Sequence, residues 1–363
     1  MALRKARAAV ASAPEIEAAA EELLGKGNAV DAVVAGVFAA CALSPGVLLG
    51  PVQILIGGAG AGLLAIDGRV RQPGIGAPRP RGFTRADEVP DASRVGVPWL
   101  PAALSVAIAA AGSATFSQIA APALALAKGT PRADVLKRLA SRGPGAIEER
   151  PLGGELLAVA GRPNGGLLTT EDLASPRPDV QRAARVVLAG PGELTKAKAR
   201  AAGVRVRPKA DSEDHPTFLI TFPWGNVESG RLAPPAHEVD VARVRAVLAV
   251  DRNATFAIAC WDEATEGLTV GELGLRAPFF AEPVRRGQTR VRPGDARPAA
   301  GPTAIIAGVA PELALCAFGA GDAYDVLALA IGSIIADDRI EAHGEARLVA
   351  VAHAGGTASV LRG

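Results

Sequence analysis

The segment VARVRAVLAVDRNATFAIAC (residues 241–260) contains two apolar runs separated by the charged and polar residues 251–253. Both runs are rich in residues that favour β-strands, so the segment is predicted to form a β-hairpin. The first run opens with Val-Arg-Ala at residues 244–246, which offers no hydroxyl, thiol or imidazole. The hairpin is therefore either purely structural or the remnant of an active site. Other motifs in the sequence help to distinguish these two possibilities.

The composition is that of a globular protein with a large core. The chain has 363 residues, of which 49% are hydrophobic and 21% charged, enough for one large domain or two ordinary ones. Its 39 basic and 37 acidic residues leave a net charge of +2, so no general attraction to nucleic acid or anionic membranes is expected. The arginine-rich residues 285–297 contain no aromatic side chain on which bases could stack, which favours a solvated loop.

The cysteines and histidines give no sign of a metal or disulfide framework. Cys41, Cys260 and Cys316 each lie in an apolar run without a CxxC pair, which predicts buried free thiols and a reducing compartment. The four histidines lie far apart in the sequence, so we expect no metal site and no cofactor.

The uncharged residues 32–66 raise the question of a membrane span. Pro and Gly residues divide this segment into pieces shorter than the ~20 residues that a span needs, which favours a buried helix followed by a buried strand. The basic N-terminus has no apolar segment ahead of its first acidic residues. We therefore expect no membrane span, no signal peptide and a cytoplasmic location.

The hydrophobic pattern predicts helices on both faces of a largely antiparallel double sheet. Residues 14–43 show helical periodicity interrupted at 25–27, with Asn28 as the cap of the second helix and Asp31 in its first turn. Residues 48–56 are predicted to form a strand, and residues 63–70 a hairpin across Asp67 and Gly68. Further helices are expected at 100–112, 115–127, 170–173 and 323–336, and further strands at 185–188, 218–222, 246–250, 255–261, 303–307, 312–317, 346–352 and 358–361.

Five ordered motifs give the sequence a family resemblance. GKGNAVDAVVAGVFAACAL (25–43) closely resembles GGNAVDAAVAAALAL, the N-terminal helix motif of the gamma-glutamyltranspeptidases. The other motifs resemble later segments of that family: GGAGAGLLAIDGRV (57–70), residues 94–129, NGGLLTTEDLASPRP (164–178) and RPGDARPAAGPTAIIAG (292–308). The chain thus resembles a divergent and shortened member of the family.

The resemblance implies an α+β fold, the four-layer αββα sandwich of the N-terminal-nucleophile hydrolases. Residues 1–363 would form a single domain of this type. Within it, residues 1–175 resemble the family's large subunit, 176–240 a shortened and irregular middle, and 241–363 the small subunit. In active relatives the precursor cleaves itself, and the new N-terminal threonine attacks a gamma-glutamyl amide.

The resemblance also places the family's catalytic elements on residues of this chain. The nucleophilic threonine falls on Val244, and the Thr and His that follow it fall on Arg245 and Ala246. In the second strand of the hairpin, Cys260 and Asp262 occupy the positions of a Thr and an Asn that hold the nucleophile and the substrate amine. The expected nucleophile position therefore carries an aliphatic side chain.

The other pocket positions are also substituted. Ala299 and Ala300 replace the two serines of the family's RPLSSM motif, and Gly76 lies where an arginine binds the substrate α-carboxylate. Ala320 and Gly321 correspond to the Gly-Gly of the oxyanion hole, where backbone donors could remain. Because the flanking anchors of these motifs are present, the pattern indicates a retained scaffold without its reactive groups.

Two functional interpretations follow. The first is a pseudoenzyme that neither cleaves itself nor transfers gamma-glutamyl groups, and acts as a structural or binding subunit in a homo-oligomer or beside an active paralogue. Weakly charged surfaces on the N-terminal helices would suit such packing. The alternative is an amidohydrolase with a displaced nucleophile, Thr255 or Thr217. Thr255 lies seven residues before Asp262, which is the Thr-to-Asp spacing of the family. The simpler explanation of Thr255 is that it is an ordinary β-branched residue of a strand.

Overall fold

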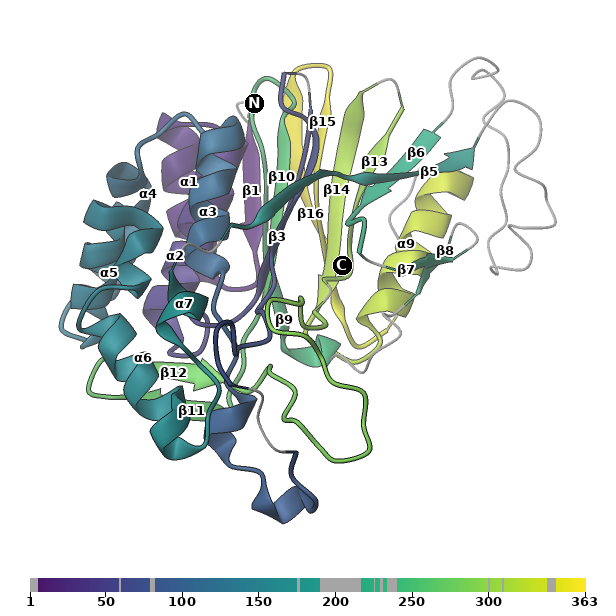
Figure 1. The fold of residues 1–363 in the computed structure, drawn as a ribbon. Helices are drawn as coiled ribbons and strands as arrows, with labels where there is room; N and C mark the ends of the chain where they lie inside the picture. Colours follow the sequence, from purple (N-terminus) through teal and green to yellow (C-terminus); the bar gives the residue numbers. More distant parts are fainter. Residues whose placement is uncertain are drawn as a thin grey trace.

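The computed structural model describes residues 6–58, 60–78, 82–174, 177–189, 217–224, 226–228, 231–233, 240–299, 301–308, 310–337 and 344–363. Two six-stranded sheets lie face to face in its centre, and helices cover the outer face of each (Figure 1). All neighbouring strands within the two sheets pair antiparallel. The predicted αββα arrangement is therefore confirmed.

The quoted hairpin lies in the middle of the first sheet. Asp251 closes its turn, because its Oδ1 accepts hydrogen bonds from the backbone N–H groups of Asn253 (2.8 Å) and Thr255 (3.1 Å). Asp251 also accepts a bond from the backbone of Ala29, which joins the turn to the start of a buried helix. The strand order of this sheet is β1 (Ala8–Ala11), β9 (Val244–Val250), β10 (Phe256–Asp262), β2 (Val52–Gly58), β3 (Gly62–Gly68) and β4 (Asp179–Arg182).

The second sheet takes strands from the middle and the C-terminal part of the chain. Its order is β16 (Thr357–Arg362), β15 (Arg347–Ala354), β14 (Pro311–Phe318), β13 (Thr303–Ala307), β6 (Thr217–Thr221) and β5 (Ala184–Ala189). Two small hairpins lie outside these sheets: β7 (Asn226–Glu228) with β8 (Arg231–Ala233), and β11 (Gly267–Val270) with β12 (Leu275–Pro278).

Most helices lie on the outer side of the first sheet (Figure 1). They are α1 (Pro14–Lys26), α2 (Ala29–Leu43), α3 (Leu100–Ala111), α4 (Phe116–Leu126), α5 (Arg132–Arg142), α6 (Leu152–Ala160) and the short α7 (Thr170–Leu173). The helix α9 (Ala323–Asp337) covers the second sheet. In the described part of the chain, none of the helices has both the length and the apolar character that crossing a bilayer requires.

The start of α2 is fixed by a reciprocal capping box. The Asn28 side chain accepts bonds from the backbone of Val30 and Asp31, which confirms the predicted cap. Asp31, expected only to favour the helix dipole, also accepts a bond from the Asn28 backbone. Asp31 is fully buried and also accepts bonds from the Ser113 hydroxyl (2.6 Å) and from the backbone of Ser113 and Ala114. One carboxylate therefore joins the first turn of α2 to the loop between α3 and α4.

Alternate residues of the central strands belong to two separate cores. Val247 and Ala249 pack toward the helices, whereas Ala246 and Leu248 pack toward the second sheet. This division follows from the two-residue period of a β-strand. The run of residues 32–56 is likewise a buried helix followed by a buried strand, as expected.

The predicted hairpin across Asp67 and Gly68 is wrong. Both residues end β3, and β2 pairs with β3 in a hairpin whose last pair is Gly58 with Gly62. Gly68 is needed for close packing, because a Cβ atom there would lie 2.6 Å from side-chain atoms of both Val52 and Ala103. Eight further strands and α-helices were not predicted: β1, β4, α5, α6, β7, β8, β11 and β12.

Candidate functional site

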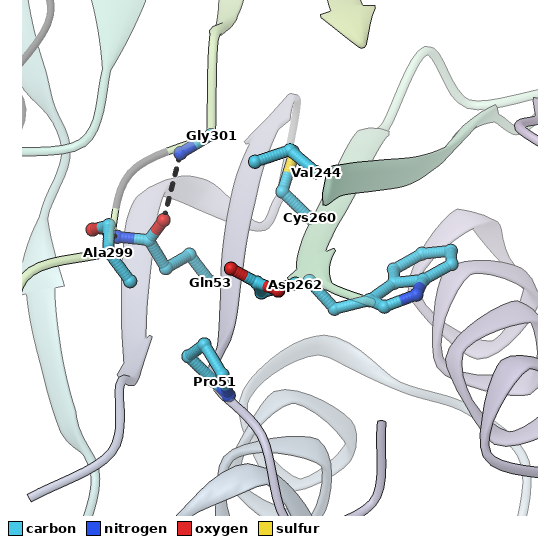
Figure 2. A pocket seen from close by; sticks show the side chains of 8 residues that line it. Pro51, Gln53, Val244, Cys260, Asp262, Ala299 and Gly301 are labelled. Atoms are coloured by element: carbon cyan, nitrogen blue, oxygen red, sulfur yellow. Dashed lines mark hydrogen bonds between the residues drawn. The ribbon is translucent and has the colours of Figure 1, made fainter. Parts of the chain in front are cut away.

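A small pocket lies at the end of the first sheet where β9 begins and β10 ends (Figure 2). Its open space is about 10 Å³, roughly what one water molecule needs. The pocket brings together four positions that the motif resemblance selects: Val244, Cys260, Asp262 and Ala299. The other lining residues are Pro51, Gln53, Trp261 and Gly301.

The register of the hairpin explains why these positions meet. Val244 is the direct cross-strand partner of Asp262, and Cys260 pairs with Gln53 on its other side. Because side chains alternate along a strand, Val244, Cys260, Asp262 and Gln53 lie on the same face of the sheet. That face is turned toward the second sheet, since Cys260 belongs to the core between the sheets.

Val244 begins β9 and is only 4% exposed. Its aliphatic side chain can neither attack a carbonyl nor accept a proton. The short 3-10 turn η5 (Val241–Arg243) precedes it, and the carbonyl of Arg243 accepts a hydrogen bond from the backbone of Glu263 (3.0 Å). The chain before Val244 is therefore tied to the end of β10.

Asp262 is the acidic group of the pocket, and a cation of the same chain already contacts it. Its side chain is 6% exposed and lies 3.2 Å from Nε of Arg243. Burial raises the pKa of Asp262 to about 6, while the charge of Arg243 and a hydrogen bond from it oppose that shift. Of the more distant charges, Asp240 raises the pKa and Arg245 lowers it. Burial thus destabilises the ionised form of Asp262, and the ion pair with Arg243 offsets part of that cost.

Gln53 forms hydrogen bonds to the segment around Ala299. Its Nε2 donates to the carbonyl of Ala299 (2.8 Å), and its Oε1 accepts from the backbone of Gly301 (3.0 Å; Figure 2). Gly301 lies so close to Cys260 that a Cβ atom added there would be 2.5 Å from the Cys260 Cβ. Gln53 was not predicted from the sequence, although a lone polar residue in the apolar strand VQILIGG was a usable signal.

Few of the described side chains that line the pocket could act as a nucleophile. Ala299 contributes only a methyl group, and Ala300 lies outside the described residues. Among the described lining residues, the Cys260 thiol is the one common nucleophilic group, and neither a hydroxyl nor an imidazole lines the space.

The Gly76 position does not line this pocket. Gly76 has a φ of +70°, and a side chain there would collide with the carboxylate of Glu171. The preceding residues Gly74 and Ile75 donate backbone hydrogen bonds to Asp172 (2.8 and 3.0 Å). These contacts give Gly76 a place in a tight turn beside α7.

Ala320 and Gly321 lie in the connection between β14 and α9 and do not line the pocket. The next residue, Asp322, accepts hydrogen bonds from the backbone of Glu345 (2.7 Å) and Ala346 (3.0 Å). This carboxylate therefore fixes the connection to the segment that leads into β15.

Thr255 lies at the opposite end of β10 from the pocket. Its backbone N–H donates to Asp251 in the hairpin turn, and the residue is 8% exposed. The seven residues of β10 separate it from Asp262 by roughly 23 Å, so the two side chains cannot act on one substrate atom. Thr217 begins β6, and its side chain lies outside the described residues.

A charged cluster lies one strand away from the pocket. Asp67 is the cross-strand partner of Gln53, and its Oδ2 lies 2.8 Å from Nη2 of Arg69 and 3.0 Å from Nη2 of Arg71. Burial would raise the pKa of Asp67, but the hydrogen bond from Arg69 and the charges of both arginines lower it overall. This cluster was not predicted either; its signal was the alternation Asp-Gly-Arg-Val-Arg, which puts three charges on one face of an extended chain.

Comparison with solved structures finds proteins of similar architecture. The structure of LmbA2991T421A matches with a TM-score of 0.71 at 13% identity, covering 98% of this chain and 96% of its own. The crystal structure of cephalosporin acylase from Bacillus halodurans matches with a TM-score of 0.65 at 12% identity, covering 99% and 96%. A gamma-glutamyltranspeptidase from Pseudomonas nitroreducens covers 56% of this chain and 80% of its own, with 21% identity and a TM-score of 0.46. No family model and no curated protein matches the chain.

The first two likenesses span nearly the whole chain at low identity, so what they establish is the fold. The chain has the αββα fold of the N-terminal-nucleophile hydrolase type. The motif resemblance to the gamma-glutamyltranspeptidases is compatible with this fold.

The buried carboxyl of Asp262 predicts a pH-dependent stability. Because its folded-state pKa of about 6 is above the ordinary value, its protonated form favours folding. This contribution is complete below about pH 4 and is lost as the pH rises through 6. Asp262→Asn does not titrate, so the stability of the wild type relative to the variant should fall by about 2 kcal/mol between pH 4 and 7.5. Urea unfolding of both proteins measures this, and a pH-independent difference would contradict it.

Proposed function

We propose that the chain is a divergent gamma-glutamyltranspeptidase relative that has lost catalysis and acts as a structural or binding subunit. The observation that carries this proposal is Val244 at the start of β9, inside the pocket where the motif resemblance puts the nucleophile. The parts that resemble the large subunit, residues 1–175, and the small subunit, residues 241–363, would stay in one uncleaved chain. The cytoplasmic location expected from the sequence is part of the same proposal.

The chemistry of the fold type supports the loss of activity. An N-terminal nucleophile needs a hydroxyl or thiol on the first residue after cleavage, with the free α-amine of that residue as the base. Val244 supplies no such group, and the peptide before it is tied by the bond between the Arg243 carbonyl and the Glu263 backbone. Self-cleavage before Val244 would therefore lack an attacking side-chain atom. It would also leave the new N-terminus held close to the end of β10.

The charge of the pocket supports the same conclusion. Asp262, which could otherwise bind a substrate ammonium, is already 3.2 Å from Arg243. Binding of a cationic substrate there would have to displace an internal ion pair.

The displaced-nucleophile alternative finds less support. Thr255 is 8% exposed in a hairpin turn, and its backbone N–H is held by Asp251. A nucleophile also needs an adjacent base, and the carboxylate of Asp251 is occupied by backbone donors from Ala29, Asn253 and Thr255. The described surroundings of Thr255 are those of a structural strand residue.

A role as a subunit requires a surface on which a partner can pack. Residues 95–127 contain no charged side chain, and they include α3 and α4 in the helical layer (Figure 1). Of these two helices, α3 packs on β2 and β3, whereas α4 packs on α2 and exposes Ala121, Ala125 and Leu126. Uncharged exposed faces of this kind favour protein contacts, so we assign the partner, a second copy or an active paralogue, to this surface.

The absence of self-cleavage is testable on purified protein. Intact mass spectrometry should find one species near 36.7 kDa, because no residue at the start of β9 can attack the preceding peptide. Edman sequencing should find no internal N-terminus. Two fragments, with a new N-terminal threonine at position 255 or elsewhere, would contradict the proposal; the Thr255→Ala variant identifies whether that residue is responsible.

The partner surface is tested by placing a charge on it. Ala125→Glu should reduce self-association at least tenfold, because the new carboxylate would lose its hydration when the contact forms. Light scattering coupled to gel filtration measures the mass, with Ala18→Glu on the exposed face of α1 as the matched control. A wild-type chain that remains monomeric at all concentrations and purifies without a partner would refute this part of the proposal.

A further inference from the structure

Two of the three cysteines face each other across the two sheets. Cys260 lies on β10 and Cys316 on β14, and both belong to the core between the sheets. Cys316 is the cross-strand partner of Thr303, two residues after Gly301. Gly301 in turn lies against Cys260, since a Cβ atom added to it would be 2.8 Å from the Cys260 sulfur. Both thiols are thus placed beside the same short segment of chain.

Burial raises the pKa of Cys316, and the neighbouring Cys260 raises it further. The Sγ of Cys316 donates a hydrogen bond to the carbonyl of Ala317 (3.5 Å). Tyr324 of α9 belongs to the same core, where burial raises the pKa of its hydroxyl and the two cysteines add to that shift. Both thiols therefore lie in one enclosed apolar core.

The pocket gives the two thiols different access to solvent. Cys260 lines the water-sized space beside Val244 (Figure 2), whereas Cys316 is fully buried behind it. Cys41 is fully buried on the other side of the first sheet, in α2. A small oxidant that enters the pocket therefore meets Cys260 first.

We propose that Cys260 and Cys316 form a redox pair that closes to a disulfide between the two sheets when the protein meets a peroxide. The Cys260 sulfur attacks one oxygen of hydrogen peroxide, the O–O bond breaks, and water leaves as the thiol becomes a sulfenic acid. The Cys316 thiol then attacks that sulfur and displaces a second water, which forms the S–S bond. The peroxide accepts the two electrons that the pair of thiols loses.

Burial raises the pKa of Cys316, and a thiolate is the reactive form of a cysteine. We therefore expect disulfide closure to be faster in alkaline solution than at neutral pH. The disulfide fixes β10 to β14 at the end of the sandwich that holds the pocket, and the oxidised protein should unfold at a temperature several degrees higher.

The test uses the full chain, reduced and then exposed to hydrogen peroxide at pH 8.5. The protein is denatured in N-ethylmaleimide, and intact mass and peptide mapping count the thiols that remain. We expect the loss of two alkylation sites, a Cys260–Cys316 cross-linked peptide that dithiothreitol reverses, and an alkylated Cys41. Cys41→Ala should behave like the wild type, and Cys316→Ala should leave a Cys260 sulfenic acid that dimedone labels.

Three results would overturn the redox pair. They are full alkylation of all three cysteines after prolonged exposure, a Cys260 sulfinic acid without a cross-link in the wild type, and a cross-link that includes Cys41. Each of these results is measured on the wild-type chain, so misfolding of a variant cannot obscure it.

Discussion

The antiparallel pairing of β9 with β10 is the constraint on which the rest of the pocket depends. It places Val244 opposite Asp262 and turns both, with Cys260, toward the second sheet. The pairing is held at its far end by Asp251, whose carboxylate closes the turn and also binds the start of α2. A slip of one residue in this register would turn the whole row of side chains to the helical face.

This constraint explains why the fold does not depend on a hydroxyl side chain at position 244. The strands are held by backbone ladders and by two cores of small and aliphatic side chains, and neither needs a hydroxyl at position 244. Val is a better strand former than most residues, so Val244 favours the strand at the position where the motif resemblance expects a threonine. The ion pair between Arg243 and Asp262 then compensates part of the cost of a buried carboxylate.

The sequence was most informative where a structure depends on nearby residues. The capping box of Asn28 and Asp31 and the turn at Asp251 are local, and both were predictable from residue type and spacing. The contacts of Gln53 with the loop at Ala299 join residues far apart in the chain, so no local pattern could locate its partners. The misplaced turn at Gly68 has a similar cause, because its small size is required by Val52 and Ala103 from other elements.

The motif resemblance located part of the pocket, whereas Gly76, Ala320 and Gly321 lie outside its lining. We propose that Val244 leaves this pocket without the N-terminal hydroxyl nucleophile of a hydrolase. The most direct measurement is hydrolysis of a chromogenic gamma-glutamyl anilide by the purified full chain. Because Val244 has no attacking atom and the thiol of Cys260 is only 2% exposed, we expect a rate equal to that of buffer alone at any protein concentration. Turnover that rises in proportion to the protein and is abolished by Thr255→Ala would contradict the claim.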